Sequence, residues 1–438
     1  MSVASALDNG SGCTLRNALL SVNAQANTGG CTASGAYGSS DRINVSATGT
    51  LTLNAASGTL LVNRAVQIVG PGASALTIAC PSGSAFSGVT IVPINNGVNV
   101  QAQGLTISHC TAAPITDSTF YLGQASGSAV TVCAANAAIN VALTDVVLSG
   151  NQGGPAFEVL EGDRGTVSFT DSTISGNAAP NCAAVYSAYS NLTIDRTTIS
   201  GNQTSGSVGG MCLDNLSVLT MTNSTISGNQ GVRINSAGSL VSVTNSTIAY
   251  QTGAGGTGID LTPGPQDLSG QPLSSSVALR NTIVAGNASV DIALAASNAL
   301  SPGGWQANYS IVQNLGGETL TGTGNLSGAA VPTVATWLGP LAANGGLTQT
   351  HALLGTAPAN PAIDQGDPSA AGLPATDQRG AGHPRVDHGR VDIGAFESTF
   401  AAPVVPGAAT PVPGLGGAGL AALSALLAGF GLRRRSKR

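Results

Sequence analysis

The segments 167-VSFTDSTISGN-177, 192-LTIDRTTISGN-202 and 219-LTMTNSTISGN-229 are three copies of one pattern. In each copy, apolar and polar residues alternate, a polar residue marks a bend, and a short run rich in β-branched residues ends in Gly-Asn. Alternation with a period of two predicts β-strands, because successive side chains of a strand point to opposite faces. Three further copies, one of them ending in Tyr-Gln, occupy residues 141–151, 241–251 and 277–287.

The spacing of these copies favours one architecture. The last large apolar residue recurs at Leu148, Ile174, Ile199, Ile226, Ile248 and Val284, so successive copies lie 22 to 36 residues apart. A repeat of roughly 20–50 residues indicates a solenoid or a propeller, and most of these repeats are shorter than the roughly 40–45 residues of a propeller blade. We therefore expect an all-β chain in which the copies are coils of a parallel β-helix, stacked about 4.8 Å apart.

Two columns of polar residues should run along the stacked coils. Stacked asparagines can hydrogen-bond to one another along the axis, and the predicted ladder consists of Asn151, Asn177, Asn202, Asn229 and Asn287. A second, mixed column contains Asp145, Asp171, Arg196, Asn223, Asn245 and Asn281. We interpret the mixed column as a ladder of turns in which Arg196 pairs with Asp171. The alternative is a calcium or acid–base site at Asp145 and Asp171.

The composition excludes several classes of protein. Of the 438 residues, 42% are hydrophobic, 8% are charged and 60 are glycine, so the chain lacks the low hydrophobicity and high charge of a disordered protein. Five of the 15 Lys and Arg residues lie in the last six positions, which leaves ten cations against 20 acidic residues in the rest of the chain. Phosphate contacts need clustered Lys and Arg, so we expect no nucleic-acid partner.

The seven cysteines fit an exported protein. Cys13 with Cys31 and Cys182 with Cys212 are plausible pairs, and we expect one to three disulfides and an odd thiol. The alternative is that some of them are small buried hydrophobic residues. The sequence contains no CxxC pair and no Cys/His spacing typical of zinc.

The end of the chain indicates an anchor. Residues 414–432 are uncharged and mostly apolar, and their number matches the roughly 20 residues that cross a bilayer. A basic block follows at once, and such a flank stays on the cytoplasmic side; it begins with Arg433, Arg434 and Arg435. A spacer rich in Pro, Ala and Gly precedes the apolar segment and should be extended. We expect a C-terminal membrane anchor or sorting tail that leaves the rest of the chain outside the cell.

The N-terminal region predicts a helix rather than an export signal. Residues 1–12 have neither a basic nor an apolar region, so we expect a signal peptide upstream of Met1. In residues 13–27, Thr14 can cap a helix whose apolar face consists of Leu15, Leu19, Val22 and Ala26. Strand edges at the end of a β-helix need covering, and this helix is suited to cover the first coil.

Short motifs at both ends carry a family resemblance. Residues 13-CTLRNA-18 resemble the CSLREA motif of exported bacterial β-helix proteins, with Asn17 in place of the motif's glutamate. The segments 338–368, 377-DQRG-380 and 391-VDIGAFE-397 resemble the closing region of choice-of-anchor Q domain proteins. The C-terminal tail is similar to sorting tails of the PEP-CTERM or IPTL-CTERM type. The resemblance implies a right-handed, pectate-lyase-like parallel β-helix that is exported and attached to the bacterial cell envelope.

The densest polar cluster lies in the C-terminal region, between Asp364 and Asp392. We interpret it as a cap held by aspartate turns and Asp–Arg pairs. The alternative is a calcium site or an acid–base pair, and the candidate metal ligands are Asp364, Asp367 and Asp377. Because both tryptophans lie beyond residue 300, we expect no aromatic platform for a sugar on the coils. The sequence shows no nucleotide-binding or hydrolase motif in a supporting context, and we expect no cofactor.

These observations predict five regions. They are an N-terminal cap with a short helix (1–42), a parallel β-helix (43–315), a C-terminal closing block (316–398), a linker (399–413) and a transmembrane or sorting tail (414–438). We expect a non-catalytic surface protein with a display, adhesive or structural role. Its partners would be the membrane, through the tail, and glycans or other components of the cell surface or matrix. A polysaccharide lyase or glycoside hydrolase is the alternative.

Overall fold

The computed structural model describes most of residues 1–401. It leaves undescribed residues 6, 9, 11, 112, 115–124, 127, 134–137, 161–164, 207–209, 215, 231–232, 237–238, 254–255, 264–274, 295–304, 356–359, 368, 370–371 and 402–438. Residues 113–114, 125–126, 233–236 and 262–263 are described by their backbone alone.

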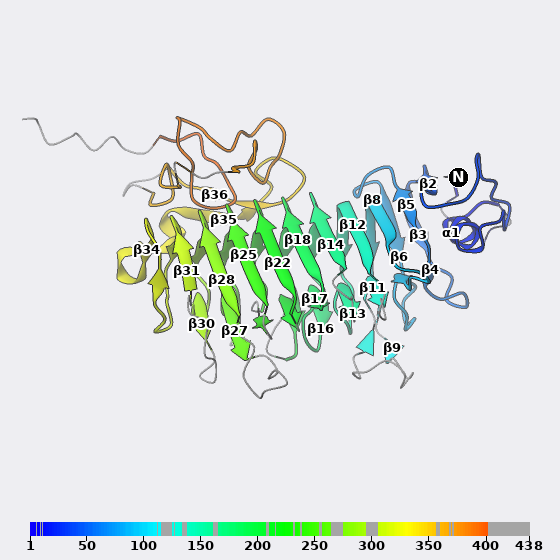
Figure 1. Cartoon of the computed structure of the whole chain (residues 1–438), viewed down its shortest axis with the longest axis horizontal. Helices are drawn as coiled ribbons and strands as arrows, with labels where there is room; N and C mark the ends of the chain where they lie inside the picture. The colour runs from blue at the N-terminus through cyan, green and yellow to red at the C-terminus, as the bar shows by residue number, and fades with distance from the viewer. Residues whose placement is uncertain are drawn as a thin grey trace, which may run out of the picture. The chain divides into compact units, whose positions relative to one another are not determined.

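Residues 1–337 form a rod of stacked coils (Figure 1). A 21-stranded sheet makes two of its faces, because each coil bends once within this sheet. The strands before the bend are β1 (Ser2–Val3), β2 (Arg42–Val45), β5 (Val66–Val69), β8 (Val98–Ser108), β12 (Ile139–Ser149), β14 (Thr166–Thr170), β18 (Asn191–Asp195), β22 (Val218–Thr222), β25 (Leu240–Thr244), β28 (Ser276–Arg280), β31 (Trp305–Asn308) and β33 (Leu320–Thr321). Those after it are the second halves of β8 and β12, with β3 (Gly49–Thr52), β6 (Leu76–Ala79), β15 (Thr173–Ser175), β19 (Thr198–Ser200), β23 (Thr225–Ser227), β26 (Thr247–Ala249), β29 (Ile283–Ala285), β32 (Ile311–Val312) and β34 (Leu326–Ser327).

A nine-stranded sheet makes the remaining face. Its strands are β4 (Leu60–Val62), β7 (Val89–Ile91), β11 (Val130–Cys133), β13 (Phe157–Leu160), β17 (Val185–Ala188), β21 (Met211–Asp214), β24 (Arg233–Ser236), β27 (Ile259–Pro263) and β30 (Ile292–Leu294). Three short pairs complete the list: β9 (Ala113–Pro114) with β10 (Ala125–Ser126), β16 (Ala178–Ala179) with β20 (Gln203–Thr204), and β35 (Leu338–Ala342) with β36 (Thr350–Leu353).

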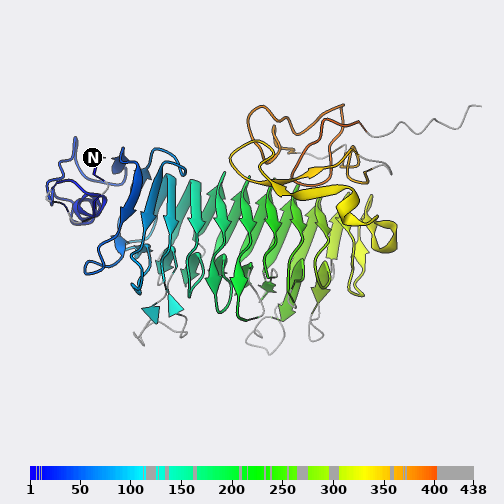
Figure 2. The same cartoon turned by 180° about the vertical axis from the view of Figure 1, so that it is seen from behind.

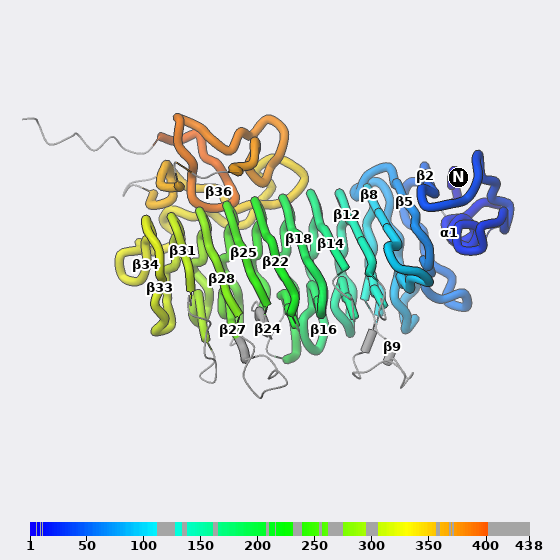
Figure 3. Tube along the Cα trace, in the orientation of Figure 1, coloured from blue at the N-terminus to red at the C-terminus, as the bar shows by residue number. Residues whose placement is uncertain are grey.

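The register of the strands confirms that the sequence copies are coils. Ile174 pairs with Ile199, Ile199 with Ile226, and Ile226 with Ile248, all in parallel. Each of these side chains is buried and points into the rod, where alternate residues of every face meet in one continuous apolar core. The tube in Figure 3 shows the coils following one another along the axis.

The coils begin earlier in the chain than the sequence predicts. Strand β1 pairs with β2 through Ser2 and Asn44, so the first residues already belong to the large sheet. Helix α1 (Leu15–Ala24) lies at the same end and contacts β4 and β2 (Figure 1). The Thr14 hydroxyl accepts a hydrogen bond of 3.1 Å from the Asn17 amide, as expected of a helix cap.

Three disulfides tie successive parts of the chain together. Both pairs expected from the sequence are present, Cys13–Cys31 and Cys182–Cys212, and Cys80–Cys110 is a third. The Cα atoms of the bridged residues lie 4.4–5.5 Å apart, which is ordinary for a disulfide. Cys133 takes no part in these bridges.

The C-terminal block, residues 338–398, does not close the end of the rod. It lies along one flank, over strands β19, β23, β26 and β29 (Figure 2). The expectation of an end cap is therefore wrong for this block. The physical reason is that its polar side chains contact the bends of successive coils. Thr348 donates to the Arg196 carbonyl, and Asp367 accepts from Arg280. Two short 3₁₀ helices, Gly328–Ala330 and Val334–Thr336, lead from the last coil into the block.

The predicted anchor falls outside the described residues. This applies to the linker from residue 402 onward, to the apolar segment 414–432 and to Arg433, Arg434 and Arg435. Among the helices that the structure describes, none has the length and apolar character needed to cross a bilayer.

Candidate functional site

The asparagine column is a buried hydrogen-bonded ladder. The side-chain oxygen of Asn177 accepts from the backbone and side-chain nitrogens of Asn151, at 3.0 and 2.9 Å. Asn202 accepts in the same way from Asn177, and Asn229 from Asn202, with all distances between 2.8 and 3.1 Å. All four side chains are fully buried. The ladder therefore satisfies backbone groups inside the rod and offers nothing to a ligand.

The ladder continues through a residue that the repeated asparagine does not predict. Gln251 stands in the next coil, where its side-chain oxygen accepts from the Asn229 amide at 2.9 Å. The side-chain oxygen of Asn287 in turn accepts from the Gln251 amide at 3.0 Å. The longer side chain of glutamine still reaches the neighbouring coil, so the column persists although the residue type changes.

The mixed column lies at the bends of the coils. Its members all have left-handed backbone, with φ between 45° and 51°, which suits Asn and Asp better than other non-glycine residues. Arg196 holds Asp171 through two contacts of 2.7 and 2.9 Å, as the sequence predicts. Asp145, one coil before Asp171, accepts from the Ala73 amide at 3.4 Å, and burial raises its pKa. Asp171 is thus paired with an arginine. The column supplies residues whose backbone adopts the left-handed conformation at each bend.

The three candidate metal ligands of the C-terminal block do not converge. Asp377 is paired with Arg379 at 2.6 Å, and Asp367 with Arg280 of the rod at 2.6 Å. The Asp364 amide donates to Asp392 at 2.7 Å. Within the described residues, no three His, Cys, Asp or Glu side chains gather as a metal site requires.

Polar side chains bind this block to the flank of the rod. The Gln378 side chain bridges two coils, because its oxygen accepts from Thr225 at 2.6 Å and its nitrogen lies 2.9 Å from the Thr198 hydroxyl. His351 lies 2.9 Å from the Ser227 hydroxyl and 2.7 Å from the Gly339 carbonyl. Burial lowers the pKa of His351, so the ring is neutral at pH 7. These contacts hold the block in place.

Inside the block, the buried Arg385 lies close to Glu397 and to the backbone of Asp392. Arg385 is almost fully buried and lies 3.2 Å from the Glu397 carboxylate. Burial raises the pKa of Glu397 to about 8 and also raises that of Asp392. An open pocket of about 470 Å³ lies nearby, between β36 and residues 396–400, and its lining includes Arg379 stacked 3.8 Å over the Phe396 ring.

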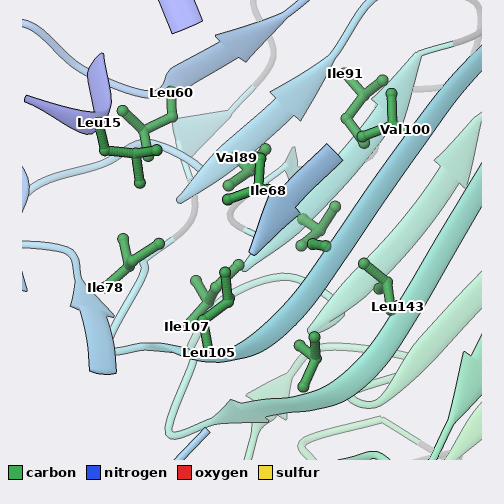
Figure 4. A pocket seen from close by; sticks show the side chains of 13 residues that line it. Leu15, Leu60, Ile68, Ile78, Val89, Ile91, Val100, Leu105, Ile107 and Leu143 are labelled. Carbon is green, nitrogen blue, oxygen red and sulfur yellow. The ribbon is translucent and has the colours of Figure 1, made fainter. Parts of the chain in front are cut away.

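A further cavity lies within the first coils and has no functional character. It measures about 20 Å³, and all 13 residues that line it are apolar, among them Ile68, Leu105 and Leu143 (Figure 4). Ala102 also lines it, one coil from Ile68 and one from Leu143. A space of this size without polar partners stays dry.

A cluster that the sequence does not reveal lies on the outer side of the nine-stranded sheet. Glu158 is 1% exposed, and burial raises its pKa to about 7. Ser128 donates to one carboxyl oxygen at 3.3 Å, and the other oxygen has no partner. Tyr186 occupies the same position in the next coil, where burial, the charge of Asp214 and a hydrogen bond to it raise the pKa of the tyrosine.

The sequence contains only a weak signal for this cluster. In 157-FEVL-160 the glutamate occupies a polar position of the alternation, which predicts an outward and solvated side chain. The position is outward, as the alternation predicts, but it is buried. Burial of an outward position depends on other parts of the chain, so a local pattern could not predict the raised pKa.

Two family models match the chain. The one described as right handed beta helix region matches residues 74–266 and 140–315, and the IPTL-CTERM motif matches residues 410–437. A search of curated proteins found no match. Among solved structures, the A-module of the mannuronan C-5 epimerase AlgE4 from Azotobacter vinelandii is similar, with 13% identity and a TM-score of 0.32. That alignment covers 67% of this chain and 90% of the other.

Proposed function

Because the chain belongs to the right-handed β-helix family and carries an IPTL-CTERM motif, we propose that it is an exported rod with a non-catalytic display, adhesive or structural role. The sorting motif is the observation that carries this proposal. Three disulfides support it, since disulfides persist in oxidising compartments outside the cytoplasm.

The construction of the rod fits mechanical display. Its interior is one continuous apolar core, and a buried amide ladder links successive coils. Each coil pairs with the coil before it and the coil after it, so stiffness along the axis comes from repeated pairing of backbone and side chains. Helix α1 closes the first coil in this proposal, because it buries Leu15, Leu19 and Val22 against that end.

The tail attaches the rod to the membrane in this proposal. Residues 414–432 would span the bilayer, and the basic block from Arg433 would stay on the cytoplasmic side. The lateral faces of the rod are then presented outside the cell, where they would contact glycans or other components of the surface or matrix.

Cell fractionation tests the proposal. A full chain with a signal peptide fused upstream, expressed in a bacterium that processes IPTL-CTERM tails, should be found in the envelope fraction and be sensitive to added protease in intact cells. A variant that lacks residues 410–438 should instead be released into the medium. Retention of both forms in the cytoplasm would contradict export, and equal envelope binding of both would contradict the role of the tail.

Catalysis on a carbohydrate is the second candidate, and the Glu158 cluster is the observation that favours it. A carboxyl group whose pKa lies near 7 is suited to transfer protons at neutral pH. Incubation with a panel of polysaccharides should then yield reducing ends or unsaturated uronates, and Glu158→Gln should abolish them. If no product forms with the unaltered chain, the catalytic candidate is rejected.

A further inference from the structure

An exposed apolar patch lies at a corner of the rod. Tyr189 and Leu216 follow strands β17 and β21 on adjacent coils, and they are 44% and 48% exposed. Val218 and Leu240 pair with each other on the neighbouring face of the large sheet, and Leu240 is 52% exposed. We name these four residues the corner patch. Three large, exposed apolar side chains of the described residues, those of Tyr189, Leu216 and Leu240, thus lie on three successive coils, where folding alone would favour polar residues.

Two members of the corner patch have a strained backbone. Tyr189 has φ 54° and Leu216 has φ 58°, a left-handed conformation that bulky residues rarely adopt. Tyr250 and Tyr309 share this conformation, but Tyr250 donates to the Leu338 carbonyl at 2.9 Å, and the Tyr309 ring lies against Gly324. By contrast, the side chains of Tyr189 and Leu216 are about half exposed. A strained residue that also exposes apolar surface indicates a role other than stability.

An exposed column of hydroxyl side chains lies beside the corner patch on the large sheet. It crosses the same coils and consists of Thr193, Thr220 and Ser242. These hydroxyls can donate and accept hydrogen bonds at the surface, next to the apolar side chains of the patch.

We propose that the corner patch binds a neutral polysaccharide chain. The Tyr189 ring and Leu216 would contact the apolar faces of sugar rings, and the hydroxyl column would exchange hydrogen bonds with sugar hydroxyls. The column of hydroxyls beside the patch can donate and accept but carries no charge to attract a uronate or sulfate polymer. This inference rests on the proposed function, since it names the class of surface glycan that the rod would hold and the place where it binds.

Asparagine substitutions test the corner patch without disturbing the turns. Asparagine accepts left-handed backbone, so Tyr189→Asn and Leu216→Asn should fold as well as the unaltered chain while losing the apolar contact. Leu61→Thr is the matched control, because Leu61 is a similarly exposed apolar residue on β4, several coils away. Thermal unfolding followed by circular dichroism establishes that each variant is folded.

The binding experiment uses the full chain in detergent and measures affinity by calorimetry. The probes are the hexasaccharides of cellulose, chitin, laminarin and mannan, with hexagalacturonate as the acidic comparison. We expect at least one neutral probe to bind, each asparagine variant to weaken that binding at least tenfold, and Leu61→Thr to leave it unchanged. Neutral binding that the variants do not alter, or binding of the acidic probe alone, or no binding, would overturn the inference. Protein capture at the patch without glycan binding would overturn it too. Each of these failures leaves the fractionation result, and with it the proposed function, standing.

Discussion

The same sequence motif has two different environments in this rod. In the coils that contain Thr198 and Thr225, the outward threonines are fully buried because the C-terminal block lies over them. One coil earlier, Thr173 occupies the same position and is only partly buried. The motif therefore specifies the coil and its inward residues, while its outward residues take whatever environment the rest of the chain provides.

His351, at the coils covered by the C-terminal block, and Glu158, in the coils that the block does not cover, should respond oppositely to pH. His351 attaches the block to the covered coils and has a lowered pKa. Protons then favour the unfolded state, so the stability contributed by His351 is lost as the pH falls below about 6.5. Glu158 lies among the uncovered coils and has a raised pKa, so its contribution is lost as the pH rises.

The largest loss of stability is expected at Gln378, which joins the C-terminal block to the coils that it covers. Gln378→Leu removes hydrogen bonds with Thr198, Thr225 and Thr348, and it leaves buried hydroxyls beside an apolar side chain. We expect a loss of about 4 kcal/mol in the free energy of unfolding, measured with urea. Hydrogen exchange should increase in β19 and β23 but not in β15.

Gln365→Leu is the control for this variant, because Gln365 belongs to the same block and is exposed. Its stability should stay within about 0.5 kcal/mol of the unaltered chain. Equal stability of the two variants would show that the block does not depend on its contacts with the coils.

The next largest effect concerns Glu158 in the uncovered coils. The pKa of this group is about 7 in the folded chain, against an ordinary value of 4.5. The stability of the unaltered chain should therefore decrease between pH 4.5 and pH 7 by about 3 kcal/mol. Glu158→Gln should remove this decrease, which urea unfolding at about pH 5 and pH 8 would reveal. An identical pH dependence in both chains would contradict the raised pKa.

A pair of matched substitutions compares the two environments directly. Thr225→Val deletes a buried hydroxyl that donates to Gln378, so it should destabilise the chain by about 1–2 kcal/mol. Thr173→Val changes the equivalent position of the uncovered coils and should have an effect below about 0.5 kcal/mol, because valine suits a strand and the hydroxyl can reach water. If thermal unfolding gave a similar loss of stability for the two variants, the C-terminal block would contribute little to the stability of the coils it covers.

The smallest effect is expected in the core of the first coils, far from the block. Ala102→Val adds two methyl groups next to the cavity of about 20 Å³ and keeps the strand's inward pattern. We expect a gain of about 0.5–1 kcal/mol in the free energy of unfolding, measured with urea. Ala307→Val is the control, since Ala307 occupies the same column but does not line the cavity. A loss of stability in Ala102→Val would show that this layer is already filled.

The resemblance to exported β-helix proteins and the placement of the C-terminal block rest on different observations. The right-handed β-helix and the IPTL-CTERM motif are both matched by family models, as the repeats and the apolar C-terminal segment indicate. The resemblance of residues 338–397 to a closing segment suggests the end of the rod, whereas the structure places this block on a flank. A motif can identify a segment without indicating which surface that segment will cover.

What the sequence determined alone is local and periodic. The alternation of apolar residues and the recurrence of asparagine predicted the coils, their register and most of the ladder, because each of these depends on one coil meeting the next in the same way. Only the tertiary structure decided where residues 338–398 lie and that Glu158 is buried. Those outcomes depend on contacts between segments far apart in the chain, and no periodicity records which distant segment will exclude water from a given outward position.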